Sequence, residues 1–458
     1  MKLLHSLIYI ISFLFCGIVS AQDNDSVLIS TIYREALSND WAYRTLEDLC
    51  KTTPHRLAGS EGVSKAISRM YQKIAPFADT VYLQSVMAKH WSRGKKEEAV
   101  VIIGKEKRSI AALALGGSVG TGKAGLKANV VEVHSFAELK QLGKTGIQGK
   151  MVFYNFAMDP MDMVPGRQYG KTVFQRFFGA EQAAYYGAVG TIVRSLTNIP
   201  DKNPHTGIMR YVDSIPKIPA IAISTLDADE LSRDLKLNSS LEFFMRTGCE
   251  MLPDVPSYNL IAEIRGNEIP KEVITVGGHI DSWDVGEGAH DDGVGCVHSM
   301  EVLRLIHTLK IKPKRTIRMV LFLDEEMFQV GARRYAEWVK ERNEKIYAAI
   351  ESDSGGSLPI GFSCTADSAQ YLEFQKLKSL FVPYGINRFR NDGGGVDIDF
   401  LADMHVPLLD MNPDPQRYFE YHHSANDIFE KVSFRDLQLG SATITAMIVM
   451  LDKHDSFK

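Results

Sequence analysis

The chain has 458 residues, a formal net charge of -4 and 45% hydrophobic residues. This composition supplies enough apolar material for a sizeable core, and the length predicts two or three domains. The near-neutral charge excludes an electrostatic basis for binding nucleic acid or an anionic membrane surface, so we expect neither as a partner.

The first 21 residues have the features of a secretory signal peptide. Lys2 precedes a long apolar stretch, and Val19-Ser20-Ala21 places small residues just before a cleavage site after Ala21. An N-terminal membrane anchor is the alternative, but no charge cluster follows as a stop-transfer signal. No other segment is long and apolar enough to span a bilayer. We therefore expect a secreted or periplasmic protein without a stable membrane span, with an extracellular location as one alternative.

Four cysteines remain after this segment, namely Cys50, Cys249, Cys296 and Cys364. Their scattered spacing excludes a cysteine-ligated zinc ribbon and a dense disulfide framework. One or two disulfides in an oxidising compartment stay open as an alternative to free thiols.

Three regions follow in chain order. Residues 22–121 start with helical patterns and continue with two strand-like runs, and we assign them to the N-terminal part of a catalytic domain. Residues 122–251 contain short strand-like runs between Gly-, Pro- and Lys-rich turns, which predicts an inserted β-rich domain. Residues 252–458 alternate apolar strands with helical segments and therefore predict an α/β catalytic domain. The helices expected there include 294–309, 331–345 and 434–454.

Histidines and acids follow successive strands of this last region. They are His279 after EVITVGG, Asp291 in the glycine-rich loop, Glu325 and Glu326 in FLDEE, Asp353 after YAAIES, and His423 in YFEYHHSAND. Each residue alone is typical of a turn, a helix cap or a solvated surface. Because functional groups of open α/β sheets collect beyond the carboxyl ends of the strands, we expect these side chains to meet in one site.

Charged groups beside buried strands need a partner or a bound cation, since their uncompensated burial is very costly. Two histidine nitrogens and several carboxylate oxygens suit zinc better than magnesium or calcium. Two zinc ions that share one carboxylate would use all of these residues and would clamp a bridging water. The sequence therefore predicts a centre with two zinc ions as cofactors.

The motifs GGHIDSWDVGEGAHDDGVG, FLDEE, ESDSGG and YFEYHHSAND together resemble those of the co-catalytic di-zinc exopeptidases, the superfamily of aminopeptidase Y and glutamate carboxypeptidase. The resemblance covers nearly the whole chain after the signal. It implies a mixed sheet with helices on both faces, interrupted by a protease-associated domain at residues 122–251. It also implies hydrolysis of dipeptides or short peptides, as an aminopeptidase, a carboxypeptidase or a dipeptidase.

The resemblance also implies a role for each motif residue. One zinc would be held by His279, Asp291 and Asp353, and the other by Asp291, Glu326 and His423. Asp291 would thus bridge the two ions, and the peptide bond after it is often cis in this superfamily. His422 is less favoured than His423, because the family ligand directly precedes a serine or threonine.

Two acids are expected to act beside the metals. Glu325 would be the general base that takes a proton from the bridging water and delivers it to the leaving amine. Asp281 would accept the far ring N–H of His279 and fix its orientation. Departures from the family pattern, MFQVG after Glu326 and Ile428 in place of a threonine, leave the substrate preference open.

Five more residues are candidate substrate contacts, each with a structural alternative. His205 and Arg210 of the inserted domain overhang the active site or lie in a surface turn. Asp397 lines the substrate site or caps a helix. Tyr418 and Tyr421 donate to an oxyanion or pack in the core, and packing is favoured. The sequence leaves open whether the chain is a homodimer.

Two other functions compete with the peptidase. GGSVG around Ser118 matches the nucleophile elbow of serine hydrolases, but the residues after it return to a strand where the elbow requires a helix. A binding protein with the same fold and no chemistry is the second alternative. It is disfavoured because all five metal ligands and the general base are present.

Overall fold

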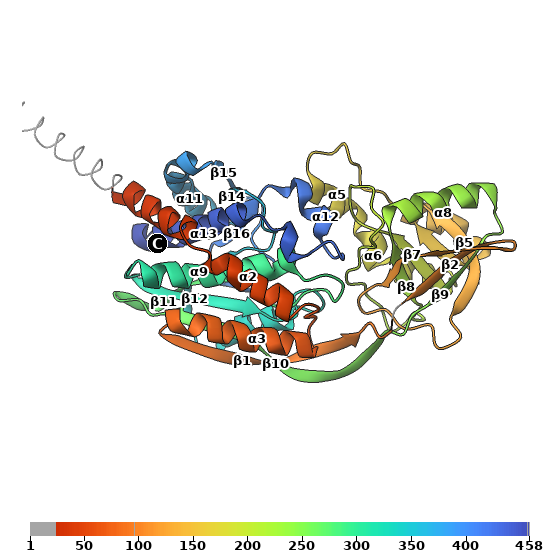
Figure 1. Cartoon of the computed structure of the whole chain (residues 1–458), viewed down its shortest axis with the longest axis horizontal. Coiled ribbons are helices and arrows are strands. Elements are labelled where there is room, and N and C mark those ends of the chain that lie inside the picture. The colour runs from red at the N-terminus through yellow and green to blue at the C-terminus, as the bar shows by residue number, and fades with distance from the viewer. Residues whose placement is uncertain (1–23, 96, 456, 458) are drawn as a thin grey trace, which may run out of the picture.

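The computed structural model describes residues 24–95, 97–455 and 457, so the expected signal peptide at residues 1–21 lies outside the described residues. The described chain forms two lobes, each built on an eight-stranded sheet (Figure 1). We call the lobe formed by residues before 93 and after 249 the main lobe. The inserted lobe is formed by the residues between them.

The main sheet is mixed and has the strand order β1-β10-β12-β11-β13-β16-β14-β15. Parallel pairing joins β12, β11, β13 and β16, whereas β10 and β14 pair antiparallel with their neighbours. All residues of β12 are buried, as expected for a strand that is covered on both faces. The strands are β1 (Thr80–Ser92), β10 (Glu250–Ile264), β11 (Ile269–His279), β12 (Arg315–Phe322), β13 (Lys345–Glu351), β14 (Pro359–Thr365), β15 (Arg388–Arg390) and β16 (Leu408–Pro413).

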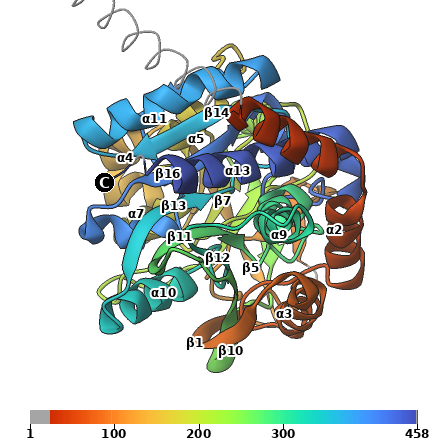
Figure 2. The ribbon, with the colours of Figure 1, turned by 90° about the vertical axis from the view of Figure 1, so that its left-hand side faces the viewer.

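Helices cover both faces of the main sheet, which confirms the predicted α/β class (Figure 2). One face packs against α3 (Glu61–Ile74), α9 (Val294–Thr308), α11 (Ser368–Phe381) and α13 (Phe434–His454). The other face packs against α10 (Val330–Glu341) and η4 (Ile398–Met404). Successive side chains of a strand point to opposite faces, so β12 gives Met319 and Leu321 to one core and Val320 and Phe322 to the other.

The remaining elements of the main lobe are short or lie at its rim. A helix spans residues 24–37, and α2 (Trp41–Thr52) packs on α9. Side-chain caps start several helices, as where Ser433 accepts the N–H of Asp436 at the start of α13. The short elements are η1 (Ala75–Phe77), η2 (Ala289–Gly293), η3 (Val382–Tyr384), η5 (Pro415–Arg417), α12 (Tyr418–Tyr421) and η6 (Phe429–Lys431).

The inserted sheet has the order β3-β2-β9-β5-β6-β7-β8-β4, and its first strands precede residue 122, where the sequence pattern placed the start of the insertion. Strands β5 to β8 pair in parallel. The strands are β2 (Glu98–Ile103), β3 (Glu106–Ile110), β4 (Ala112–Ala114), β5 (Leu126–Val133), β6 (Met151–Tyr154), β7 (Gly190–Arg194), β8 (Ala220–Ile223) and β9 (Glu242–Arg246).

The inserted lobe carries more helix than its β-rich sequence pattern predicts. Parallel neighbours need crossover connections, and helices form the connections from β5 to β6 and from β6 to β7. The helices of this lobe are α4 (Phe136–Ile147), α5 (Pro165–Thr172), α6 (Phe174–Phe177), α7 (Gly179–Tyr185) and α8 (Thr225–Leu237).

Two long strands connect the lobes. The antiparallel pairing of β1 with β10 runs from Thr80 opposite Glu263 to Ser92 opposite Glu250. The chain therefore enters and leaves the inserted lobe through one paired ribbon, which Figure 1 shows crossing from one lobe to the other. Among the described residues, no helix has the length and apolar character needed to cross a membrane, and the four cysteines are free and buried.

Candidate metal centre

The predicted ligands meet at one edge of the main sheet. His279 is the last residue of β11, Glu326 lies in the turn after β12, and Asp353 follows β13 by two residues. These three strands are neighbours, so their carboxyl ends lie side by side. Asp291 lies in η2 between β11 and α9, and His423 comes from the loop after α12.

Asp291 lies between two groups of side chains, and each of its oxygens faces a different group. Its Oδ1 is 3.3 Å from Nε2 of His279, and this nitrogen is 3.4 Å from Oδ1 of Asp353. Its Oδ2 is 3.2 Å from Nε2 of His423, and this nitrogen is 3.1 Å from Oε2 of Glu326. We call His279 and Asp353 the His279 half of the site, and Glu326 and His423 the His423 half.

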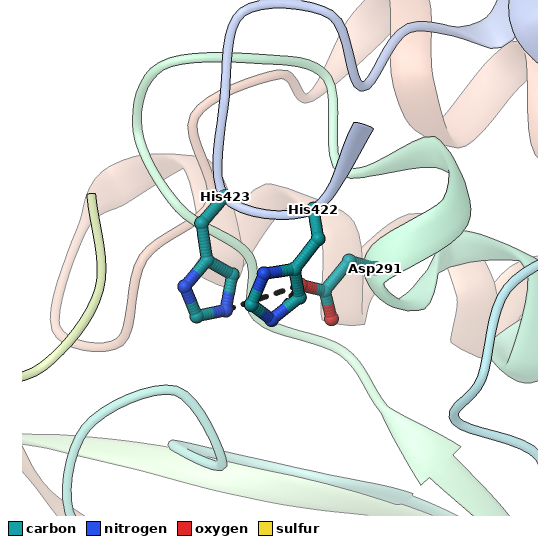
Figure 3. Close-up of side chains that lie close together, drawn as sticks. All are labelled: Asp291, His422 and His423. Atoms are coloured by element: carbon teal, nitrogen blue, oxygen red, sulfur yellow. Dashed lines mark ion pairs between the residues drawn. The ribbon is translucent and has the colours of Figure 1, made fainter. Parts of the chain in front are cut away.

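Figure 3 shows the neighbouring rings of His422 and His423 beside the carboxylate of Asp291. The two rings stack with centroids 3.5 Å apart. Nε2 of His422 is 3.9 Å from Oδ2 of Asp291, compared with 3.2 Å for Nε2 of His423. His423 is therefore the better placed ligand, and His422 packs against it.

The donor atoms of this site fit a bound cation. Four of them are buried and have no hydrogen-bond partner: Nε2 of His279, Oδ2 of Asp291, Oε1 of Glu326 and Oδ1 of Asp353. Buried polar atoms without partners are costly, and one cation in each half would give all of them a partner. Imidazole nitrogens combined with carboxylate oxygens are typical zinc ligands.

Burial and nearby charges shift the pKa values of the site residues. Burial, together with the carboxylates of Asp353 and Asp291 and against the opposing charge of His279, raises the pKa of Glu325 to about 8. Burial alone would raise the pKa of Asp291, but the adjacent rings of His279 and His423 hold it well below its usual range. Burial lowers the pKa of His423 to about 4. Asp291 is thus ionised and His423 is neutral at pH 7, the forms in which these groups bind a metal. Burial opposes protonation of His279, but Asp353 and Asp291 raise its pKa well above the usual value, so a cation that binds there would displace a proton.

Close backbone packing fixes the position of Asp291. A Cβ atom on Gly295 would lie 1.7 Å from the carbonyl oxygen of Ser352, so glycine lets the start of α9 approach the end of β13. The carboxylate of Asp292 accepts the backbone N–H groups of Gly295 at 2.9 Å and His279 at 3.1 Å. The peptide bond between Asp291 and Asp292 is cis, as the resemblance implies.

Asp281 positions His279 through its main chain and the turn with Glu325 and Glu326 through its side chain. Its backbone carbonyl accepts the Nδ1–H of His279 at 3.1 Å, whereas its carboxylate is 3.8 Å from that nitrogen. The carboxylate instead accepts the backbone N–H groups of Asp324 at 2.8 Å and Glu325 at 3.2 Å. The main chain of Asp281 therefore fixes the ring tautomer that frees Nε2, and its side chain fixes the turn that carries Glu325 and Glu326.

Two buried residues anchor the loop between His279 and Asp291. Arg56 donates to the backbone carbonyls of Ile280 at 2.7 Å, Glu287 at 2.5 Å and Gly288 at 2.6 Å. Asp427 accepts the backbone N–H groups of His290 at 2.6 Å and Asp291 at 3.1 Å. The sequence motifs assigned no metal-site role to Asp427. Its place four residues after His423 in HHSAND was the available signal.

Two of the predicted substrate contacts belong to the inserted lobe. His205 is buried, and its Nδ1 donates to the backbone carbonyl of His422 at 2.7 Å. Arg210 is partly exposed, donates to Glu181 at 3.1 Å and lies over the ring of Phe178. His205 thus reaches the ligand loop, while the described contacts of Arg210 stay within the inserted lobe.

The other three lie in the main lobe. Asp397 is buried, makes no capping hydrogen bond to η4, and has no hydrogen-bond partner at either carboxylate oxygen, so the helix-cap alternative is wrong. The ring of Tyr418 packs against His422 with centroids 5.2 Å apart. The ring of Tyr421 stacks on His290 with centroids 4.5 Å apart. The contacts of the two tyrosines are those of packed rings.

Ser118 lacks the surroundings of a nucleophile. Its hydroxyl is engaged with the main chain, because it accepts the N–H of Ala220 at 3.0 Å and donates to the carbonyl of Val119 at 3.1 Å. The next element along the chain is the strand β5, whereas a nucleophile elbow opens a helix. The G-x-S-x-G match is therefore a structural turn.

Comparison with known proteins agrees with this geometry. The model of "Peptidase family M28" matches residues 259–448. Carboxypeptidase Q of Mus musculus is 36% identical over 88% of this chain and 83% of its own length. Carboxypeptidase Q of Homo sapiens is 36% identical over 93% of this chain and 87% of its own length. The chain belongs to peptidase family M28. This membership makes it a hydrolase of the metallopeptidase class.

Solved structures share the fold. A peptidase M28 precursor from Shewanella amazonensis superposes with a TM-score of 0.90 at 31% identity and covers 94% of this chain and 97% of its own. A zinc aminopeptidase from Bacillus subtilis has a TM-score of 0.63 at 19% identity, over 89% and 93% of the two chains. The second likeness concerns the fold alone.

Proposed function

We propose that this protein is an exported zinc exopeptidase that binds two zinc ions through Asp291 as a shared ligand. The observation that carries the proposal is that the two oxygens of Asp291 face separate His–carboxylate pairs at 3.2–3.3 Å. One zinc ion would be held by His279, Asp291 and Asp353. The other would be held by Asp291, Glu326 and His423.

Zinc ions in this site would act as Lewis acids toward water and toward the carbonyl group of a peptide bond. Glu325 is the residue placed to move protons there. Its Oε2 is 4.0 Å from Nε2 of His279, and it is not needed as a ligand in either half. Its place beside Glu326, with its backbone N–H held by the carboxylate of Asp281 at 3.2 Å, suits a group that takes a proton from water and returns it to the leaving amine.

The substrate would bind in a cleft of about 560 Å³ where the two lobes face each other. Ser354, next to the ligand Asp353, lines this cleft together with Tyr418 and Phe419, and Met163 and Val164 line it from the inserted lobe. A cleft of this size takes a dipeptide or the end of a short peptide. We propose that the inserted lobe, residues 93–249, is a protease-associated domain that shapes this cleft.

Metal removal tests the proposal against its two alternatives. Hydrolysis of dipeptides should stop with 1,10-phenanthroline and return with added zinc, and a library of free and end-blocked peptides should show which terminus must be free. Hydrolysis that survives complete zinc removal would contradict metal catalysis. Absence of hydrolysis by the zinc-loaded protein across the library would favour the binding-protein alternative. N-terminal sequencing of the exported protein should place its first residue after Ala21.

A further inference from the structure

The inserted lobe touches the metal centre through main-chain contacts. Residues 201–206 of this lobe lie along residues 422–427, the segment that carries His423. His205 and Ser424 form an isolated β-bridge, and the N–H of Thr206 donates to the carbonyl of His423 at 2.9 Å. The segment in the inserted lobe is therefore hydrogen-bonded to the main chain of a proposed zinc ligand.

The ring of His423 is oriented by the same segment. Its Nδ1 lies 3.3 Å from the carbonyl oxygen of Thr206 and 3.4 Å from Nη1 of Arg176. Because Nη1 already donates to the carbonyl of Thr206 at 3.2 Å, we assign the proton to Nδ1, which then donates to the same carbonyl. This hydrogen bond selects the tautomer in which Nε2 is free, and Nε2 is the atom that faces Asp291 and Glu326. A carbonyl that accepts the far N–H of a ligating histidine typically fixes the ring and strengthens metal binding. In the His279 half the corresponding carbonyl belongs to Asp281 of the main lobe itself.

The backbone of His423 needs external support. It has a positive φ of 60°, a conformation that is uncommon for residues other than glycine and that persists only when surrounding contacts hold it. His205 supplies such a contact, because its Nδ1 donates to the carbonyl of His422 at 2.7 Å. Asn203 adds a second one by donating to the side chain of Asn426 at 2.8 Å.

Arg176 of α6 holds the accepting carbonyl in place. Its Nη1 donates to the carbonyl of Thr206 at 3.2 Å, and its Nη2 donates to the hydroxyl of Tyr169 at 2.7 Å. Arg176 is buried, so this arrangement is shielded from water. The acceptor of the His423 ring N–H and the donors to His422 and Asn426 therefore all belong to the inserted lobe.

From these contacts we infer that the inserted lobe is a working part of the metal centre, because its segment 201–206 positions His423 and sets the zinc affinity of the His423 half. His205 is a positioning residue in this scheme and does not touch the substrate. The inference rests on the proposed two-zinc site. It gives His205 a role at the ligand loop, where the sequence left an overhang of the active site and a surface turn as alternatives.

The test compares three variants of the full-length protein by zinc titration against a chromogenic chelator, with zinc alone as the probe. His205→Ala removes the hydrogen bond to the His422 carbonyl and should weaken one of the two zinc sites about 10- to 100-fold, leaving the other within threefold. His205→Asn keeps a donor close to the position of Nδ1 and should restore affinity. His134→Ala, at an exposed histidine of the same lobe, is the matched control and should bind zinc like the wild type.

A double-mutant cycle identifies the affected half. In a Glu326→Ala background, His205→Ala should cause little further loss of zinc affinity, since both substitutions act on the His423 half. In an Asp353→Ala background, it should lower the zinc affinity of the second site as well. Circular dichroism checks the fold, and Asn203→Ala gives a milder perturbation should His205→Ala fold poorly. Two unchanged zinc affinities in folded His205→Ala, or equal loss at both sites, would overturn the inference. A wild type that binds only one zinc would instead contradict the proposed function.

Discussion

The two halves of the metal centre are held in different ways. His279 is fully buried at the end of a central strand, and its ring N–H is accepted by a carbonyl two residues farther along the same chain segment. His423 lies on a loop with positive φ, and its ring N–H is accepted by a carbonyl of the other lobe. The His279 half is therefore a product of the main sheet alone, whereas the His423 half also depends on how the lobes contact each other.

The largest effect is expected from a substitution of Asp291, the residue that both halves share. Asp291→Ala takes a ligand from each half and would leave the two proposed cations with less negative charge between them. The variant should lose more than one zinc equivalent and all measurable hydrolysis. Metal counting by atomic spectroscopy after dialysis against a weak chelator checks this, with circular dichroism to verify folding. Retention of two tightly bound zinc ions would refute the shared carboxylate and with it the division into two halves.

A smaller effect is expected where neither half loses a ligand. Glu325→Gln should keep both zinc ions and reduce turnover by a factor on the order of 10²–10⁴, because the amide cannot take up a proton. Steady-state kinetics and zinc counting on the same preparation give the result. If the variant binds only one zinc ion, Glu325 is itself a zinc ligand and belongs to one of the two halves.

The comparison becomes sharper when one half is damaged alone. Asp353→Ala removes a carboxylate that faces His279 and should lose mainly one zinc equivalent, while the His423 half keeps its own. Glu326→Ala is the matched change in the other half. Equal and complete loss of both ions in each variant would mean that the halves fill and empty together.

The smallest effect is expected far from both halves. Ser118→Ala removes a hydroxyl that bonds to the main chain of the inserted lobe, so turnover per zinc-loaded enzyme should stay within about twofold of the wild type even if stability falls by about 1 kcal/mol. Active-site titration and thermal unfolding separate the two quantities. A large fall in turnover with an intact zinc content would reopen the serine-hydrolase alternative.

The sequence predicted those features that depend on regular patterns. The alternation of strands and helices indicated the main sheet, and the acids and histidines after successive strands indicated where the ligands meet. The predicted helix 434–454 agrees with α13. In the inserted lobe, the helical stretch EQAAYYG agrees with α7, whereas the other helices between the strands were not predicted.

Contacts between distant segments were beyond the reach of sequence patterns. The role of Arg56 depends on carbonyl groups more than 200 residues away, and backbone carbonyls leave no trace in a sequence. The same holds for Thr206, whose contribution to His423 comes from its main chain and not from its side chain. The sequence leaves an overhang of the active site and a surface turn as alternatives for His205, and only the fold shows that its ring is buried against the ligand loop.

The paired ribbon of β1 and β10 bears on how this chain folds. These two neighbours are separated in sequence by the entire inserted lobe, so their pairing must close a very long loop. The entropic cost of closure rises only with the logarithm of loop length, yet contacts of such high sequence separation slow folding. An inserted lobe that folds first brings residues 92 and 250 together, and the long loop then behaves like the short turn of a hairpin. In the order of synthesis, the inserted lobe is complete before β10 and before every proposed zinc ligand. Segment 201–206 is therefore already present when the segment that carries His423 is made.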